Sequence, residues 1–208
     1  MKRTSRGDDG RLQERRQRIA QEAARLIAVH GLEDYHQAKL KAARQFGFLD
    51  ESSLPRNAEV QAQLREYQRL FQGDQQPRAL RVRREAALQA MQFFGAFEPR
   101  LVGSVLDGTA GENSSVQLHA FSDDADVFAR FLQEHDLPAE STERRLRIDR
   151  GQARNFPAWS FGADGLPFEV AVLPVTMLQQ PPLGQFDDKA MPRASLAALR
   201  TLLAEQTR

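Results

Sequence analysis

A glycine and a serine that follow an apolar run are the first residues of this chain suited to binding phosphate. Residues 97–105 are predicted to form a strand that runs into Gly103 and Ser104. A Gly-Ser pair after a strand leaves backbone N–H groups and a hydroxyl facing a cleft, where they can donate to phosphate oxygens. The sequence therefore predicts a phosphate-binding loop at Gly103 and Ser104.

A second predicted strand, residues 115–121, alternates between apolar and polar side chains. Because successive side chains of a strand point to opposite faces, one face is apolar and the other carries a polar row. The apolar set is Val116, Leu118 and Ala120, and the polar set is Ser115, Gln117 and His119. A polar row beside a phosphate-binding loop is the arrangement that a nucleotide-binding site requires.

Residues 100–121 resemble the nucleotidyltransferase superfamily, in its minimal, polymerase-beta-like form. The hallmark of that family is Gly-Ser, a short loop, and Ser-Asp-x-Asp on the next strand. Gly103 and Ser104 match its first part and Ser114 matches the later serine, whereas Ser115 and Gln117 stand where the family has metal-binding aspartates. The resemblance covers about residues 77–175. It implies transfer of a nucleoside monophosphate from a nucleoside triphosphate to an acceptor, with Mg²⁺ as the cofactor of an active member.

A third metal carboxylate, which the family takes from a neighbouring strand, has a match in Glu169. This glutamate interrupts the apolar run of residues 166–173 and is predicted to point away from the core-facing Phe168 and Val170. An isolated carboxylate in an apolar strand is uncommon. By resemblance, Glu169 is the catalytic and metal-binding residue; the alternative is a half-exposed glutamate on a solvent-facing sheet.

The two replaced aspartates predict a degraded metal centre. A hydroxyl and an amide, as in Ser115 and Gln117, bring no charge to a magnesium ion. We therefore expect a pseudo-enzyme that binds a nucleotide or phosphate group through Gly103, Ser104, Ser115 and Gln117. Two alternatives stay open: an active metal-dependent nucleotidyltransferase with an unknown acceptor, and a non-catalytic module for protein or nucleic-acid contacts.

Further polar residues near this region have two interpretations each. His119 is either a structural, hydrogen-bonded histidine or an acid–base residue. On the predicted strand 141–148, alternation places Arg145 and Arg147 on one face and Arg144 on the other. These arginines fit either phosphate binding or a charged edge strand that discourages aggregation.

Composition sets the remaining limits. The chain has 208 residues, 41% hydrophobic and 27% charged, and it has no cysteine, which excludes disulfides and thiol chemistry. Residues 1–90 carry 18 basic and 12 acidic side chains, so the N-terminal helices are either a nucleic-acid contact or a solvated basic surface. With neither a secretory signal nor an apolar run that could span a bilayer, we expect a soluble cytoplasmic protein without membrane contact.

The order of predicted elements indicates an α+β fold. Residues 1–76 read as an N-terminal helical segment, 77–178 as a nucleotidyltransferase-like mixed sheet flanked by helices, and 179–208 as a Pro-rich connection followed by a C-terminal helix. Helices that precede a set of short strands are typical of this class.

Overall fold

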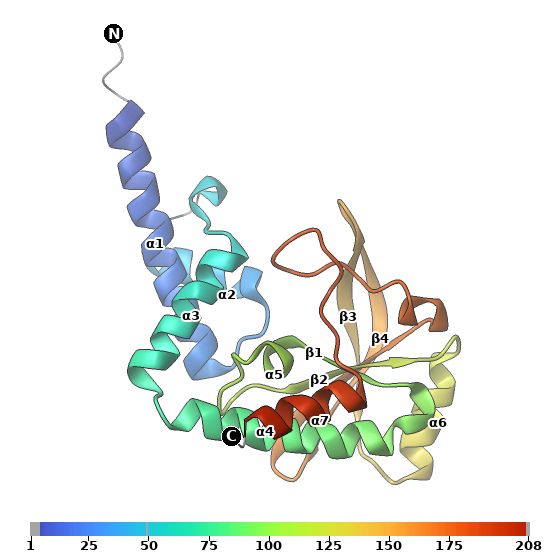
Figure 1. Cartoon of the computed structure of the whole chain (residues 1–208). Coiled ribbons are helices and arrows are strands. Elements are labelled where there is room, and N and C mark those ends of the chain that lie inside the picture. Colours follow the sequence, from blue (N-terminus) through green and yellow to red (C-terminus); the bar gives the residue numbers. More distant parts are fainter. Residues whose placement is uncertain (1–4, 49, 207–208) are drawn as a thin grey trace. The chain divides into compact units, whose positions relative to one another are not determined.

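The computed structural model describes residues 5–48 and 50–206 and confirms the predicted α+β class (Figure 1). The chain forms two compact units. The described residues up to Pro77, together with Gly111–Asn113, make the first unit, and Arg78–Ala110 with Ser114–Arg208 make the second.

The first unit is helical. Its elements are α1 (Ser5–His30), α2 (Tyr35–Gln45), the short 3-10 helix η1 (Glu51–Ser53) and α3 (Asn57–Phe71). Asp34 caps α2 by accepting a hydrogen bond of 2.8 Å from the backbone N–H of His36. α1 packs against both α2 and α3 through fully buried side chains, which include Ile19, Ala23, Ala42, Val60 and Leu64.

The second unit is a five-stranded mixed sheet with helices. Its elements are α4 (Gln75–Phe93), η2 (Gly95–Phe97), β1 (Arg100–Val102), α5 (Gly103–Asp107), β2 (Val116–Phe121), α6 (Ala125–Glu134), β3 (Glu140–Asp149), β4 (Gln152–Ala163), β5 (Leu166–Leu173), η3 (Val175–Leu178) and α7 (Leu196–Glu205). The strand order is β1-β2-β5-β4-β3. β2 and β5 are parallel, and the other neighbours are antiparallel.

The predicted strand 97–105 is too long. β1 ends at Val102 because Gly103 adopts a φ of +70°, which takes the chain out of the extended conformation, and Gly103–Asp107 then forms the helix α5. The apolar Val105, read as a strand residue in the sequence, is therefore a buried helical residue. Apolar runs this short do not distinguish a strand from a helical turn.

The two faces of the sheet differ in character. The first face is apolar and packs with α4, α6 and α7, as the alternation of residues 116–120 predicts. Its core includes Met91, Leu118, Phe128, Trp159, Val170 and Leu199. The second face carries Gln117, His119 and Glu169 at one end, and at the other an apolar cluster of Phe121, Leu146, Phe156 and Leu173.

A segment after η3, residues 183–194, crosses the second face from edge to edge. Leu183 pairs with Arg147 on the edge strand β3, and Ala194 pairs with Leu101 on the opposite edge strand β1. Between these anchors, Met191 packs on the apolar cluster. Figure 1 shows this segment beside β3 and β4 before the chain enters α7. We call residues 183–194 the strap; it covers the apolar end of the second face.

Two adjacent arginines of α4 hold the loop that joins α5 to β2. Arg84 Nε donates to the carbonyl of Val105 at 3.1 Å, and Arg83 Nε donates to the carbonyl of Ser114 at 2.7 Å. Both side chains are buried, although arginine is rarely buried without partners for its donors. Neither can therefore contribute to a solvent-facing basic surface. Their role is to fix both ends of this loop.

Replacing Arg84 with alanine is expected to lower the free energy of unfolding by about 2 kcal/mol, because it leaves the buried Val105 carbonyl without its donor. The matched control is Arg81→Ala. Arg81 lies on the same helix with half of its side chain exposed and pairs with Glu85 at 2.9 Å, so its loss is expected to cost less than about 1 kcal/mol. Urea denaturation of both variants measures the difference; equal losses would contradict this role for Arg84.

Candidate functional site

The turn at Gly103 is closely covered by a side chain of the next strand. A Cβ atom at position 103 would lie 2.2 Å from Gln117 Oε1, and the φ of +70° is itself unfavourable for any residue with a Cβ. Val102 and Gln117 are paired in the β1–β2 ladder, which brings the glutamine to the end of β1. Glycine is therefore required here both by the backbone conformation and by the contact with Gln117.

Gln117 and Glu169 lie side by side. They are partners in the register of the parallel strands β2 and β5, so their side chains share one face of the sheet. Glu169 is partly exposed, at 24% of its side chain, and forms an ion pair with Arg144 of β3 at 3.2 Å. The structure therefore brings the predicted residues Gly103, Gln117 and Glu169 to one end of the second face and adds Arg144 to them.

Ser104 is held in place but leaves its hydroxyl unused. The Ser104 carbonyl accepts hydrogen bonds of 3.0 Å from the backbone N–H groups of Gly108, Thr109 and Ala110. Its Oγ is buried and has no hydrogen-bond partner in the described part of the chain. Since a buried polar atom without a partner costs about 1–3 kcal/mol, this hydroxyl is a candidate atom for a ligand to contact. The remaining predicted residue, Ser115, precedes β2 by one position and is partly buried.

His119 belongs to the same polar row but is closed off from solvent. It is 3% exposed, and its Nδ1 has no hydrogen-bond partner among the described residues. Burial, with smaller contributions from the positive charges of Arg193 and Arg144, lowers the pKa of His119 from 6.5 to about 3. The imidazole is therefore neutral at physiological pH. Its burial and neutral state are those of a structural histidine, and the acid–base alternative stays a prediction.

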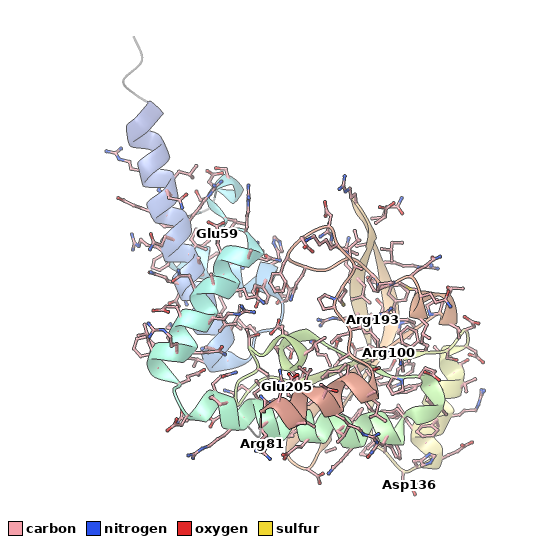
Figure 2. All side chains as sticks on the ribbon, viewed as in Figure 1. Glu59, Arg81, Arg100, Asp136, Arg193 and Glu205 are labelled. Carbon is pink, nitrogen blue, oxygen red and sulfur yellow. The ribbon has the colours of Figure 1, made fainter. Side chains whose placement is uncertain are left out.

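Arg193, which the sequence analysis did not single out, lies on the same face of the sheet as this polar row. Arg193, near the end of the strap, donates to the carbonyls of Met177 at 2.7 Å and Leu178 at 2.8 Å, and its guanidinium lies over the ring of Phe121. Burial lowers the pKa of Arg193, and the nearby charge of Arg100 lowers it further (Figure 2). Nothing in the sequence around Arg193 indicates this position, because the strap that delivers it has no periodic pattern.

The donor set does not fit a two-magnesium centre. The only carboxylate at the three family positions is Glu169, and it is already engaged by Arg144. Gln117 and Ser115 supply neutral oxygens, whereas Mg²⁺ sites in nucleotide enzymes rely on carboxylates. In residues 5–48 and 50–206, no group of three or more His, Asp or Glu side chains is arranged to hold a metal ion.

Comparison with known proteins assigns no family to this chain. No protein-family model matches the sequence, and no curated protein and no solved structure is significantly similar to it. Among the described helices, none combines the length and the apolar character that crossing a membrane requires. Function is therefore inferred from the residues of the site.

The contact between Gly103 and Gln117 predicts a coupled effect on stability. Gly103→Ala is expected to cost about 2–3 kcal/mol, of which about 1–2 kcal/mol comes from the left-handed conformation and the rest from displacement of the buried Gln117 amide. In a Gln117→Ala background only the conformational part remains. A double-mutant cycle by urea denaturation measures the difference, and purely additive losses would contradict the contact.

The buried, neutral His119 predicts a loss of stability in mild acid. Its folded pKa of about 3 lies below the ordinary 6.5, so the unfolded chain binds a proton that the folded chain does not. The stabilisation is complete above the unfolded pKa and falls as the pH drops below it. Between about pH 7 and about pH 5.5 the free energy of unfolding is expected to fall by about 1 kcal/mol.

His119→Gln is expected to remove most of that pH dependence, measured by urea denaturation at both pH values. The matched control is His36→Gln, which replaces an exposed histidine on α2 and is expected to retain the dependence. A pH dependence that survives His119→Gln would show that another group causes it.

Proposed function

We propose that the second unit binds a nucleotide through its phosphates at Gly103 and Ser104, as a nucleotidyltransferase-like protein that lacks a two-metal centre. The observation that carries this proposal is the buried Ser104 hydroxyl, which lies directly after the Gly103 turn and has no hydrogen-bond partner in residues 5–48 and 50–206. A phosphate oxygen is the acceptor that such a hydroxyl and the adjacent backbone would suit.

The neighbouring strands support the same interpretation. In the family that residues 100–121 resemble, a carboxylate from a neighbouring strand lies beside those of the strand after the loop. Glu169 is in register with Gln117 on the neighbouring parallel strand β5, which is what this resemblance would require. Gln117 and Ser115 therefore stand at the positions of the family's two aspartates but are neutral, so the site lacks their negative charge.

Positive charge for the phosphates comes from Arg144. Its guanidinium lies 3.2 Å from Glu169 Oε1, and one third of the side chain remains exposed. A guanidinium has five donors, so Arg144 is able to hold a phosphate while it keeps its contact with the carboxylate. In this arrangement Arg144 supplies part of the charge that metal ions supply in active family members. We therefore propose binding without nucleotidyl transfer.

Isothermal titration with ATP tests this proposal. We expect heat of binding that persists in EDTA, because the ligand is held by protein donors. Ser104→Ala is expected to weaken binding roughly tenfold, which corresponds to one hydrogen bond of about 1.4 kcal/mol, and Arg144→Gln is expected to weaken it at least as much. Ser141→Ala and Arg145→Gln, at exposed positions of β3, are the matched controls with unchanged affinity.

Glu169→Ala separates the two nucleotide hypotheses. For a binding protein, removing this carboxylate leaves ATP affinity unchanged or tighter, because Arg144 loses a competing acceptor. For an active enzyme it abolishes magnesium-dependent incorporation of labelled nucleotide. Absence of heat with ATP under all conditions would contradict the proposed function, and binding that EDTA abolishes would favour the metal-dependent alternative.

A further inference from the structure

His119 is a buried polar residue of the second unit to which the proposed function assigns no part. It is 3% exposed, and its Nδ1 atom has no hydrogen-bond partner among the residues that the structure describes. Its partner in β5 is Ala171, whose side chain has no polar atom, and its partner in β1 is Arg100. Buried polar atoms in native proteins normally have a hydrogen-bond partner, so this nitrogen is a candidate contact for a ligand.

Arginines from two elements lie near this imidazole. Arg100 is opposite His119 in the β1–β2 ladder, so the two side chains share one face of the sheet. Arg193 comes from the strap, and its guanidinium lies over the ring of Phe121, which is two residues beyond His119 on that face. Burial lowers the pKa of Arg193, and the positive charge of Arg100 contributes, so these two arginines are also close to each other (Figure 2).

The carboxylates on this face compensate only some of the arginines. Glu169 pairs with Arg144 at 3.2 Å. Glu98 lies 3.6 Å from Arg100 but is 68% exposed, and an ion pair of this kind is weak. Arg193 is half-buried and donates to two carbonyl groups, and no carboxylate lies within ion-pair distance of it in residues 5–48 and 50–206. A guanidinium without a counter-charge, beside an imidazole nitrogen without a partner, favours an oxyanion as the ligand.

We infer that Arg100, His119 and Arg193 form a second anion subsite, which binds a phosphate group. Its donors come from β1, from β2 and from the strap, and the oxygens of one phosphate can accept from several donors at once. A guanidinium has five donors, so Arg193 has others besides the two that its carbonyl partners use. In one of its two neutral tautomers, the imidazole donates through Nδ1. The side chain of Arg100 is 22% exposed, so the subsite is open to solvent on that side.

The subsite lies beyond Gln117 along β2. His119 follows Gln117 by two residues on the same face, which places it about 7 Å further along the strand. A phosphate bound there comes either from the nucleotide proposed to bind at Ser104 or from a second molecule. The inference does not depend on nucleotide binding at Ser104, because inorganic phosphate is the probe that tests it.

NMR of the histidine ring nitrogens tests this subsite during titration of the full chain with sodium phosphate at constant pH and ionic strength. We expect a saturable shift of the His119 signals, which His119→Gln identifies, and no shift for the exposed His36. Arg193→Gln and Arg100→Gln are each expected to weaken phosphate binding about tenfold or more, because each removes a charged donor. Arg200→Gln, at an exposed position of α7, is the matched control with unchanged affinity.

Two further titrations separate this subsite from the Ser104 loop. Ser104→Ala is expected to weaken ATP binding but to leave the phosphate response of His119 unchanged. Displacement of phosphate from His119 by ATP would assign the subsite to a phosphate of the nucleotide, and retention would assign it to a second molecule; either result supports the subsite.

Circular dichroism confirms that each variant keeps its fold. Because Arg193 also holds the carbonyls of Met177 and Leu178, Arg100→Gln is the deciding variant if Arg193→Gln does not fold. The absence of a saturable shift at His119 would overturn the inference. A shift that Arg100→Gln leaves at its wild-type strength, or that Ser104→Ala abolishes, would overturn it as well.

Discussion

The left-handed turn at Gly103 is the constraint on which the second unit depends. It ends β1 after three residues and starts α5, and it leaves room for the side chain of Gln117 directly above the backbone. The buried Arg83 and Arg84 then fix the loop that returns the chain to β2. Contacts from several elements therefore fix the position of Ser104, whose hydroxyl makes no hydrogen bond to any residue that the structure describes.

On the polar face of the sheet near this turn, the negative charge of Glu169 is balanced by a neighbouring arginine. Gln117 and His119 are neutral, and Glu169 is compensated by Arg144. The strap covers the other end of the face, where Met191 packs on the apolar cluster and Arg193 donates to the carbonyl of Met177. Since Arg144 and Glu169 cancel, the positive charge of Arg193 remains, and it favours an anionic group over a divalent cation on this face. This balance supports our proposal that the site binds an anion and does not carry out metal-dependent chemistry.

Much of this arrangement could be predicted from local sequence patterns. Alternation along residues 116–120 predicted the core face of β2, and the isolated Glu169 was predicted to point away from the core, which places it on the same face as Gln117. The ion-pair partner of Glu169 could not be predicted, because Arg144 is on β3 and reaches Glu169 on β5 across the strand β4 that lies between them. Burial of the α4 arginines was also not predictable, since a charged helix surface normally faces solvent. The register of parallel strands and the course of the strap depend on long-range contacts that no local pattern encodes.

A crystal structure of the protein grown with Mg²⁺ and a non-hydrolysable ATP analogue tests the central claim most directly. We predict a phosphate oxygen within hydrogen-bonding distance of Ser104 Oγ and of the Arg144 guanidinium, with no cation between the phosphates and Glu169. Phosphates bound elsewhere on the chain, or bridged by two cations that Glu169 coordinates, would contradict the account.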